Sequence, residues 1–243
     1  ETLLKMAQEG KSFEDLPEEE VSFPMVYHFS GLRENILSWY PLKKADSVLE
    51  IGAGCGAITG MLCRKAGHVT SVELSKHRAD INYARNRDKE NLTIMVGNLN
   101  DMTFPEKFDY VVVNGVLEYA MSFTEGKTPY ETFLQRMGAY LKPEGRLLIA
   151  IENRLGLKYF AGAPEDHTDL HFFGINGYPG NQSVRTFSKN ELGELLENSG
   201  FPFLRFYYPY PDYKFPTEIF TDESLYTNSY GRSYPVYTDK TAD

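Results

Sequence analysis

The chain has 243 residues, of which 42% are hydrophobic, so it is long enough to bury one α/β core with modest additions. Its 25 Lys and Arg residues stand against 34 Asp and Glu residues, which gives a net charge of -9. No basic stretch is long enough to follow a phosphate backbone, so we expect no nucleic-acid partner.

The start of the chain combines an acidic segment with a candidate helix. Residues 1–25 are acidic and weakly patterned, and we treat them as an N-terminal segment outside the main domain. After them, Leu32, Ile36 and Trp39 lie at helical spacing before Pro41. This spacing predicts a helix at residues 30–40 that packs on the sheet.

Strands and helices alternate from residue 47 onward. Apolar strands are expected at residues 47–51, 69–73, 93–96, 110–113 and 146–151, and helices at residues 57–65, 75–86 and 129–140. Continuous apolar strands in this order are typical of a parallel sheet that is covered on both faces. The pattern predicts a Rossmann-like α/β domain at residues 26–225.

The C-terminal part closes this domain. Capping boxes at residues 128–131 and 188–191 mark two helix starts, and Gly200 ends the second helix. Two further strands are predicted around a proline-rich turn, which gives a mostly parallel seven-stranded sheet with a C-terminal β-hairpin. Residues 226–243 are a polar tail, and it stays open whether the chain is a fragment of a larger protein.

A glycine-rich turn follows the first strand of the domain. Gly52, Ala53, Gly54 and Gly56 can bring the backbone close to a ligand and present helix N–H groups at the carboxyl edge of the sheet. The spacing of Gly52, Gly54 and Ala57 also satisfies the dinucleotide fingerprint. The turn alone therefore fits either S-adenosylmethionine or NAD.

Two acidic residues favour S-adenosylmethionine. Glu50 lies two positions before Gly52, where its carboxylate can meet the positive charge of an amino acid moiety but would repel a pyrophosphate. Glu73 ends the second strand, where a carboxylate can accept hydrogen bonds from ribose hydroxyls.

Further cofactor contacts are expected along the same edge. Asn98 follows the third strand and can accept from the adenine amino group, with Leu74 and Leu99 on the faces of the ring. Asn114 follows the fourth strand and is expected beneath the methionine part of the cofactor. Tyr27 precedes the first strand, and we expect it to contribute to a lid.

Three stretches carry a family resemblance. They are VLEIGAGCGA at residues 48–57, NGVLEY at residues 114–119 and IENRLGLKYFAGAPEDH at residues 151–167. Through them the chain resembles bacterial class I methyltransferases associated with surface polysaccharide biosynthesis, often beside glycosyltransferases. The resemblance implies S-adenosylmethionine as cofactor, O-methylation of a glycan or small-molecule acceptor, and a glycosyltransferase domain or partner.

A long polar insertion at residues 152–186 is expected to form the acceptor pocket or a lid, because loops of this length in compact domains are usually functional or disordered. Within it, His167 is the first candidate for a general base, and Glu118, after the fourth strand, is the second. His171 can instead bond within the loop. Asp166, His167, Asp169 and His171 lack a recognisable ligand spacing, so no metal is expected.

Several alternatives stay open at this stage. Arg154, Lys158 and Arg185 can hold an anionic group of the acceptor or serve as loop charges. An NAD-dependent dehydrogenase or epimerase would need a Tyr and a Lys four apart on a helix, and Tyr83 with Arg87 comes nearest without matching. A non-catalytic scaffold module of a larger glycan-assembly protein is the third possibility.

The chain carries no export or membrane signal that we recognise. No run reaches about 18 apolar residues, and the polar start lacks a signal-peptide core. Cys55 and Cys63 are too far apart along one helix to form a disulfide. We therefore expect no membrane insertion and a cytoplasmic location.

Overall fold

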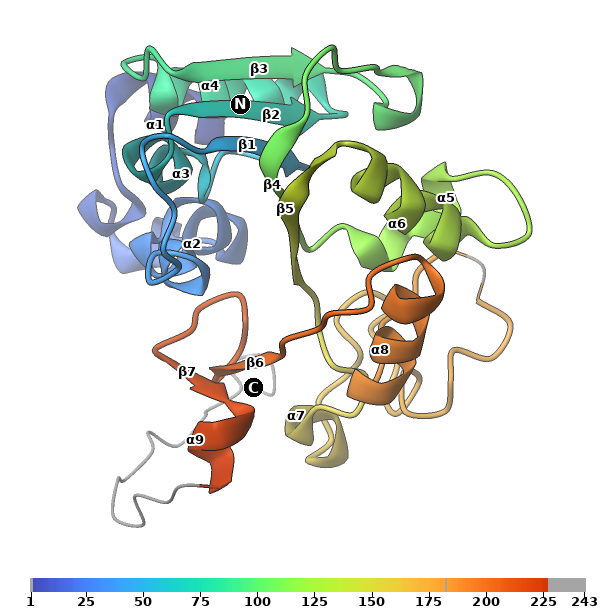
Figure 1. The fold of residues 1–243 in the computed structure, drawn as a ribbon. Helices are drawn as coiled ribbons and strands as arrows, with labels where there is room; N and C mark the ends of the chain where they lie inside the picture. The colour runs from blue at the N-terminus through green and yellow to red at the C-terminus, as the bar shows by residue number, and fades with distance from the viewer. Residues whose placement is uncertain (1, 182, 227–243) are drawn as a thin grey trace.

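Five strands form one parallel sheet that carries the candidate site (Figure 1). The computed structural model describes residues 2–181 and 183–226. The strands are β1 (Ser47–Ile51), β2 (His68–Glu73), β3 (Leu92–Val96), β4 (Phe108–Asn114) and β5 (Leu141–Ala150), in the order β3-β2-β1-β4-β5. The order reverses between β1 and β4, and the crevice at such a switch point is where open α/β sheets bind ligands.

Side chains that alternate along the strands build a core on each face of the sheet. Val48 and Val112 pack on one face with Leu62, and Leu49 packs on the other face with Phe133. The helices that cover the sheet and its edges are α3 (Thr59–Lys65), α4 (Lys76–Asn86), α6 (Pro129–Ala139) and α8 (Lys189–Asn198). The predicted Rossmann-like α/β fold with helices on both faces is thus confirmed.

The N-terminal segment forms helices α1 (Thr2–Glu9) and α2 (Phe23–Phe29) and the 3-10 helices η1 (Phe13–Asp15) and η2 (Glu18–Glu20). Helix α1 packs against α4. The helix predicted at residues 30–40 is shorter than expected, since the chain forms the 3-10 helix η3 (Gly31–Ile36) and then turns at residues 37–39. Trp39 Nε1 donates to the Ile36 carbonyl at 3.0 Å, which takes up an acceptor that a longer α-helix would use.

The expected single sheet of seven strands is not confirmed. β6 (Tyr207–Tyr210) and β7 (Glu218–Thr221) pair with each other as a separate antiparallel sheet, which α9 (Asp222–Tyr226) follows. Pro202, Pro209 and Pro211 provide the physical reason, because proline has no N–H group to donate to a neighbouring strand. The predicted tail at residues 226–243 lies outside the described residues apart from Tyr226.

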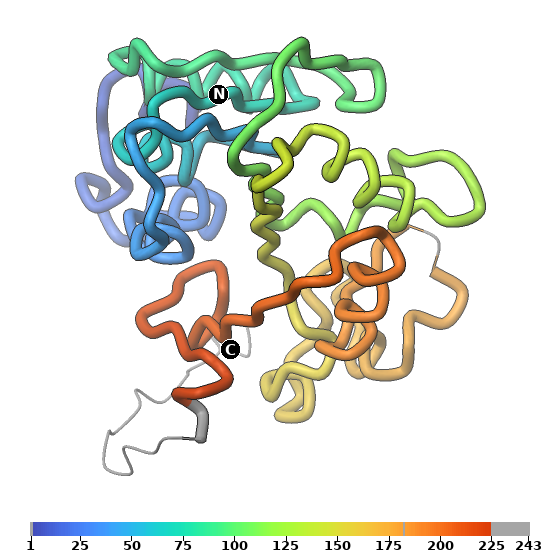
Figure 2. The backbone as a smooth tube through the Cα atoms, in the orientation of Figure 1, coloured from blue at the N-terminus to red at the C-terminus, as the bar shows by residue number. Residues whose placement is uncertain are grey.

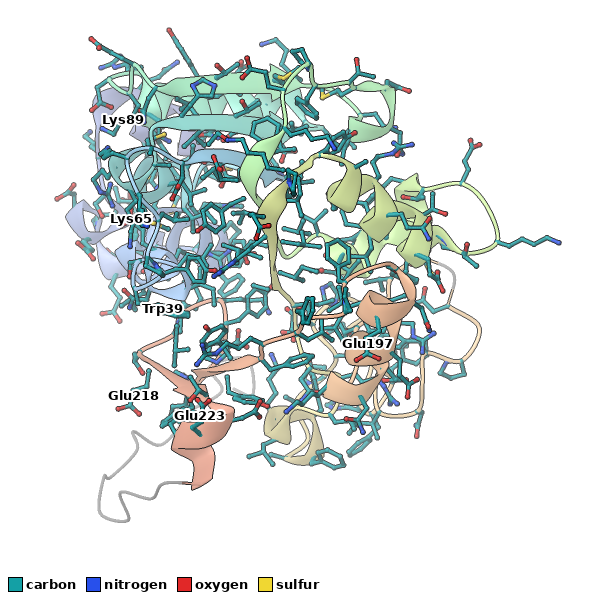
Figure 3. The ribbon with its side chains drawn as sticks, viewed as in Figure 1. Trp39, Lys65, Lys89, Glu197, Glu218 and Glu223 are labelled. Atoms are coloured by element: carbon teal, nitrogen blue, oxygen red, sulfur yellow. The ribbon has the colours of Figure 1, made fainter. Side chains whose placement is uncertain are left out.

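The C-terminal hairpin folds back onto the N-terminal helices. Figure 2 shows its turn beside the blue segment at residues 23–40, and Arg33 Nη1 donates to the Lys214 carbonyl at 3.0 Å. Asn35 Nδ2 donates to the Pro216 carbonyl at 2.8 Å. Trp39, labelled in Figure 3, contacts the ring of Tyr207 with centroids 4.7 Å apart. This packing carries Lys214 toward the carboxyl edge of the sheet.

Shorter helices connect these elements, namely η4 (Leu99–Asp101), η5 (Leu117–Tyr119), α5 (Ala120–Phe123) and α7 (Leu157–Phe160). Cys55 and Cys63 are free and buried, in agreement with their spacing. Within the described ranges, no helix has the length and apolar character needed to cross a bilayer.

One of the two predicted capping boxes is confirmed. Ser188 accepts from the Glu191 backbone N–H, and the Glu191 carboxylate accepts from the Ser188 N–H at 2.8 Å. Thr128 makes no side-chain cap, because its ψ of 64° lies outside the extended conformation of a capping residue. Pro129 still opens helix α6, as its position predicted.

The cap at Ser188 and the missing side-chain cap at Thr128 give a test of the fold. A Ser188→Ala variant should lose about 1 kcal/mol of unfolding free energy, because the first turn of α8 loses its cap. A Thr128→Ala variant should change it by less than about 0.5 kcal/mol. Urea unfolding measures both, and equal losses in the two variants would contradict the assignment of the caps.

Candidate active site

The glycine turn is shaped by close contacts of its backbone. The N–H groups of Gly52 and Ala53 donate to the Val72 carbonyl at 2.9 and 3.1 Å, which ties the turn to β2. Gly52 has a φ of 69°, and a Cβ there would lie 2.3 Å from Val116 Cγ2. Gly54 has a φ of 56° with no atom within 4 Å of an added Cβ. The turn is therefore tight at Gly52 and open at Gly54, where a ligand can approach the backbone.

Glu73 braces this turn. Its carboxylate accepts from the Gly54 N–H at 2.8 Å and from the Ser75 N–H at 2.9 Å, and the residue is 5% exposed. Each oxygen keeps a second lone pair that can accept a further hydrogen bond. Glu73 thus lies beside Gly54, at the end of β2 where the sequence places it.

Glu50 is held in a buried hydrogen-bond network. Its Oε2 accepts from Thr59 Oγ1 at 2.7 Å and from Ser71 Oγ at 2.5 Å, and Asn82 Nδ2 donates to Thr59 Oγ1 at 3.2 Å. Burial raises the pKa of the Glu50 carboxyl in spite of these donors. The pattern that found Glu50 gave no indication of Thr59, Ser71 or Asn82, because they come from separate elements.

The other predicted cofactor residues lie along the same edge. Asn98 caps η4 by accepting from the Asn100 N–H at 2.9 Å, Leu99 is buried, and Leu74 is 66% exposed. Asn114 ends β4, and its Oδ1 is buried without a hydrogen-bond partner among the described residues.

Tyr27 lies at the C-terminal end of α2. The Arg33 guanidinium stacks over its ring at 4.3 Å from the centroid. Phe215 makes an edge contact with the same ring at 6.3 Å. The tyrosine is thus tied to the hairpin turn that carries Lys214.

A buried cluster of ionisable groups lies beyond the carboxyl ends of β4 and β5. His167 Nε2 is 3.7 Å from Glu118 Oε1 and 3.9 Å from Glu152 Oε2, while its Nδ1 is 2.8 Å from Glu165 Oε1. Glu118, Glu152 and Glu165 are each at most 4% exposed. We call these four residues the acidic cluster.

The cluster is joined to the cofactor turn by two contacts. Val116, which packs on Gly52, lies two residues before Glu118. A Cβ at Gly115 would lie 3.5 Å from Glu118 Oε1 and 3.0 Å from the Tyr213 hydroxyl. The same short segment after β4 therefore faces both the glycine turn and the acidic cluster.

Two lysines flank the acidic cluster. Lys214 Nζ is 2.5 Å from Glu152 Oε1 and 3.3 Å from Asp166 Oδ1. Lys158 Nζ is 2.6 Å from Asp166 Oδ2 and 3.0 Å from Asp212 Oδ2. These ion pairs connect the insertion to the hairpin turn.

The environment shifts the protonation equilibria of the cluster. Burial alone would lower the pKa of the His167 imidazole, but hydrogen bonds to Glu118 and Glu165 and the charge of Glu152 raise it to about 10. Burial opposes ionisation of Glu165, yet the contacts with His167 and Thr168 lower its pKa to about 2. Burial raises the pKa of Glu118. The imidazole therefore holds a proton at neutral pH.

The structure bears on four residues for which the sequence left two possible roles. Arg154 and Arg185 pair with Glu191 and Lys158 pairs with two aspartates, so all three cations form internal ion pairs. His171 Nδ1 lies 2.8 Å from the Gly162 carbonyl, in agreement with a loop role.

The sequence analysis missed Glu152, Glu165, Asp212 and Lys214. Glu152 had a signal, since it directly follows the last strand of the parallel sheet at the edge where ligands bind. Lys214 had none, because only the folding of the hairpin brings it to the cluster.

The fold and the glycine turn define a class of Rossmann-like cofactor-binding domains, and comparisons with known proteins narrow it. A family profile described as a methyltransferase domain matches residues 49–149. The Methanosarcina mazei protein named "Probable ribosomal RNA small subunit methyltransferase A" is 39% identical over 93 residues, which are 38% of this chain and 33% of that protein. The chain spans about a third of the length of the curated relatives it matches first.

Two solved structures share the fold. The CcbJ methyltransferase of Streptomyces caelestis has a TM-score of 0.54 at 17% identity, over 77% of this chain and 83% of that chain. Phosphoethanolamine N-methyltransferase 1 of Haemonchus contortus, solved with phosphoethanolamine and S-adenosylhomocysteine, has a TM-score of 0.51 at 18% identity, over 79% of this chain and 38% of that chain.

Residues 49–149 therefore match a methyltransferase domain, and the Rossmann-like fold is the one that these solved methyltransferases share. The match favours S-adenosylmethionine over NAD as the ligand of the glycine turn.

The buried ion pairs give a second test. A Lys214→Met variant should lose about 3–5 kcal/mol of unfolding free energy, because it leaves the buried Glu152 without its lysine, while Asp166 keeps Lys158. A Lys76→Met variant removes the exposed pair with Asp80 and should lose less than about 1 kcal/mol. Urea unfolding of both variants checks this difference, and similar losses would contradict the buried network.

Proposed function

We propose that the protein transfers the methyl group of S-adenosylmethionine to a hydroxyl of a carbohydrate or related small molecule bound at the acidic cluster. The observation that carries the proposal is the position of this cluster, which follows β4 and β5 and adjoins the glycine turn through Val116. Carboxylates can accept hydrogen bonds from the hydroxyl groups of a neutral acceptor.

The cofactor residues in this proposal follow the edge of the sheet. Gly52, Ala53 and Gly54 approach the cofactor with their backbone, and Glu73 accepts from the ribose hydroxyls. Asn98, Leu74 and Leu99 contact the adenine ring, while Glu50 and Asn114 lie on the methionine side and Tyr27 contributes to the lid. The open space at Gly54 and the unpartnered Oδ1 of Asn114 support this assignment.

Methyl transfer is an in-line displacement. A lone pair of the acceptor oxygen forms the new C–O bond, the S–CH3 bond breaks, and its electron pair stays on sulfur. Alignment of the two reactants supplies a large part of the rate, equivalent to about 7–11 kcal/mol in well-oriented systems. The residues of the cluster then orient the acceptor and take up its proton.

We propose Glu118 as the group that receives this proton and His167 as its catalytic partner. Glu118 has a raised pKa and an Oε2 without a hydrogen-bond partner among the described residues, so it can accept a proton. His167 carries a proton of its own, which it would have to release before it could act as a general base. Its ring is held beside Glu118 by Glu165.

The charge of the site favours a neutral acceptor over the acceptors that the names of two relatives indicate. One relative is named for ribosomal RNA and another for phosphoethanolamine. The carboxylates of the cluster and the net charge of -9 would repel phosphate groups. The segment after β4 also reads Asn114-Gly115-Val116 and lacks the Pro-Pro-aromatic motif of nucleobase amino methylation.

We extend the proposal to the biological process and the partner of the protein. The resemblance carried by residues 151–167 supports a role in surface glycan biosynthesis in the cytoplasm, with a glycosyltransferase domain or partner. Within the chain, we propose residues 26–225 as the catalytic unit and residues 152–186 as the segment that forms the acceptor pocket or lid.

Calorimetry with the full chain tests the cofactor residues. S-adenosylhomocysteine should bind and NAD should not. A Glu73→Ala variant should bind S-adenosylhomocysteine more than about tenfold more weakly, because the ribose loses its acceptor and the Gly54 N–H loses its partner. The exposed Glu197 on α8, labelled in Figure 3, provides the control Glu197→Gln. Preferential binding of NAD would contradict the proposal.

Turnover measurements test the acceptor site. Neutral sugars should be methylated in preference to phosphoethanolamine and to RNA. A Glu118→Gln variant should lower kcat by about 10²–10⁴-fold while its affinity for S-adenosylhomocysteine stays unchanged. A Glu125→Gln variant alters an exposed carboxylate and should keep full turnover. Full activity of the Glu118→Gln variant would remove Glu118 as the proton acceptor.

A further inference from the structure

We propose that Glu118, Glu152 and His167 bind a divalent transition-metal ion that holds the acceptor hydroxyl for methylation; this inference rests on the proposed function. One ligand atom from each of the three residues lies within 4.8 Å of the others. Two carboxylates with one imidazole are a mixed oxygen and nitrogen set, which suits Mn²⁺ and related ions better than the all-oxygen preference of Mg²⁺.

Two of the three ligand separations are short enough for a single ion. His167 Nε2 lies 3.7 Å from Glu118 Oε1 and 3.9 Å from Glu152 Oε2. With metal–ligand bonds of about 2.1–2.2 Å, these separations correspond to angles of roughly 120° at the metal. Three protein ligands leave coordination positions open for water or an acceptor, as in catalytic metal sites.

Unpartnered oxygen atoms provide an independent observation. Glu118 is 1% exposed and Glu152 is 4% exposed. Glu118 Oε2 and Glu152 Oε2 have no hydrogen-bond partner among the described residues. Buried carboxylate oxygens without a partner are costly, so a cation bound to Glu152 Oε2 would restore its missing interaction, while Glu118 Oε2 stays free to accept a proton.

The surroundings of His167 match those of a metal ligand. Its Nδ1 faces Glu165 Oε1 at 2.8 Å, which leaves Nε2 directed at Glu118 and Glu152. Glu165 is itself fixed by the Thr168 hydroxyl at 2.9 Å and by the Tyr178 hydroxyl at 3.0 Å. A carboxylate on the far ring nitrogen is the usual outer partner of a metal-bound histidine, because it orients the ring and sets its tautomer.

The balance of charges in this region also supports a bound cation. Five carboxylates, those of Glu118, Glu152, Glu165, Asp166 and Asp212, lie in this region with two ammonium groups, those of Lys158 and Lys214. Neither lysine is paired with Glu118 or Glu165. Counting the imidazolium of His167, these groups carry about two negative charges, and a dication that displaces the imidazolium proton would leave about one.

The ion would act on the acceptor rather than on the cofactor. A hydroxyl held by it would be more acidic and would keep a fixed orientation toward the sulfonium methyl group. Its proton would pass to Glu118 Oε2, its oxygen lone pair would form the C–O bond, and the electrons of the broken S–CH3 bond would stay on sulfur. His167 would then be a ligand through Nε2, whose proton leaves to solvent when the ion binds.

Calorimetry with Mn²⁺ on the full chain, freed of metals with EDTA, tests the inference. We expect saturable binding of about one Mn²⁺ per chain. Glu118→Gln and His167→Ala should each weaken it at least about tenfold, and Glu165→Gln by about 10–100-fold. The Glu118→Gln variant keeps the size of the side chain, so its circular dichroism spectrum should be unchanged.

The matched control is Asp169→Asn, which removes an exposed carboxylate from the same insertion and keeps a residue that tolerates the φ of 58°. It should bind Mn²⁺ like the unaltered chain. Absence of saturable binding, or equal binding by the Glu118→Gln and His167→Ala variants, would overturn the metal site. Binding of S-adenosylhomocysteine by the same sample without Mn²⁺ binding would reject the metal site and leave the proposed function standing.

Discussion

The contact between Gly52 and Val116 is the constraint on which the site depends. It joins the turn after β1 to the segment after β4. The two segments are so close that a Cβ added at Gly52 would lie 2.3 Å from Val116 Cγ2. Parallel strands bring their carboxyl ends to one edge, and the strand order reverses between β1 and β4. The close contact at this switch point therefore holds the cofactor turn and Glu118 in one place.

The acidic cluster is assembled from distant parts of the chain. Glu118 follows β4, Glu152 follows β5, His167 comes from the insertion and Lys214 from the hairpin turn. No local element fixes these residues relative to one another, so their ion pairs and the packing of the hairpin on η3 must do so. Buried carboxylates are tolerated here because hydrogen bonds and lysines compensate part of their charge.

The sequence predicted the parts of the fold that depend on residues close to one another along the chain. The five parallel strands and the glycine turn follow from apolar runs and glycine spacing, and the Ser188 cap follows from a local pattern. The seven-stranded sheet was not confirmed, since β6 and β7 pair only with each other and prolines near β6 remove donors. The Thr128 cap was wrong because of the backbone angle of that residue. His167 and Glu118 were found as single residues, but their approach to within 3.7 Å is a tertiary property.

The most direct test of the account is a crystal structure of the full chain with S-adenosylhomocysteine and Mn²⁺. We predict the homocysteine sulfur in the crevice between β1 and β4, directed toward Glu118, with anomalous density from one metal ion between Glu118, Glu152 and His167. A cofactor bound on the far side of the sheet, or a sulfur directed away from the acidic cluster, would contradict the central claim that methyl donor and acceptor meet there.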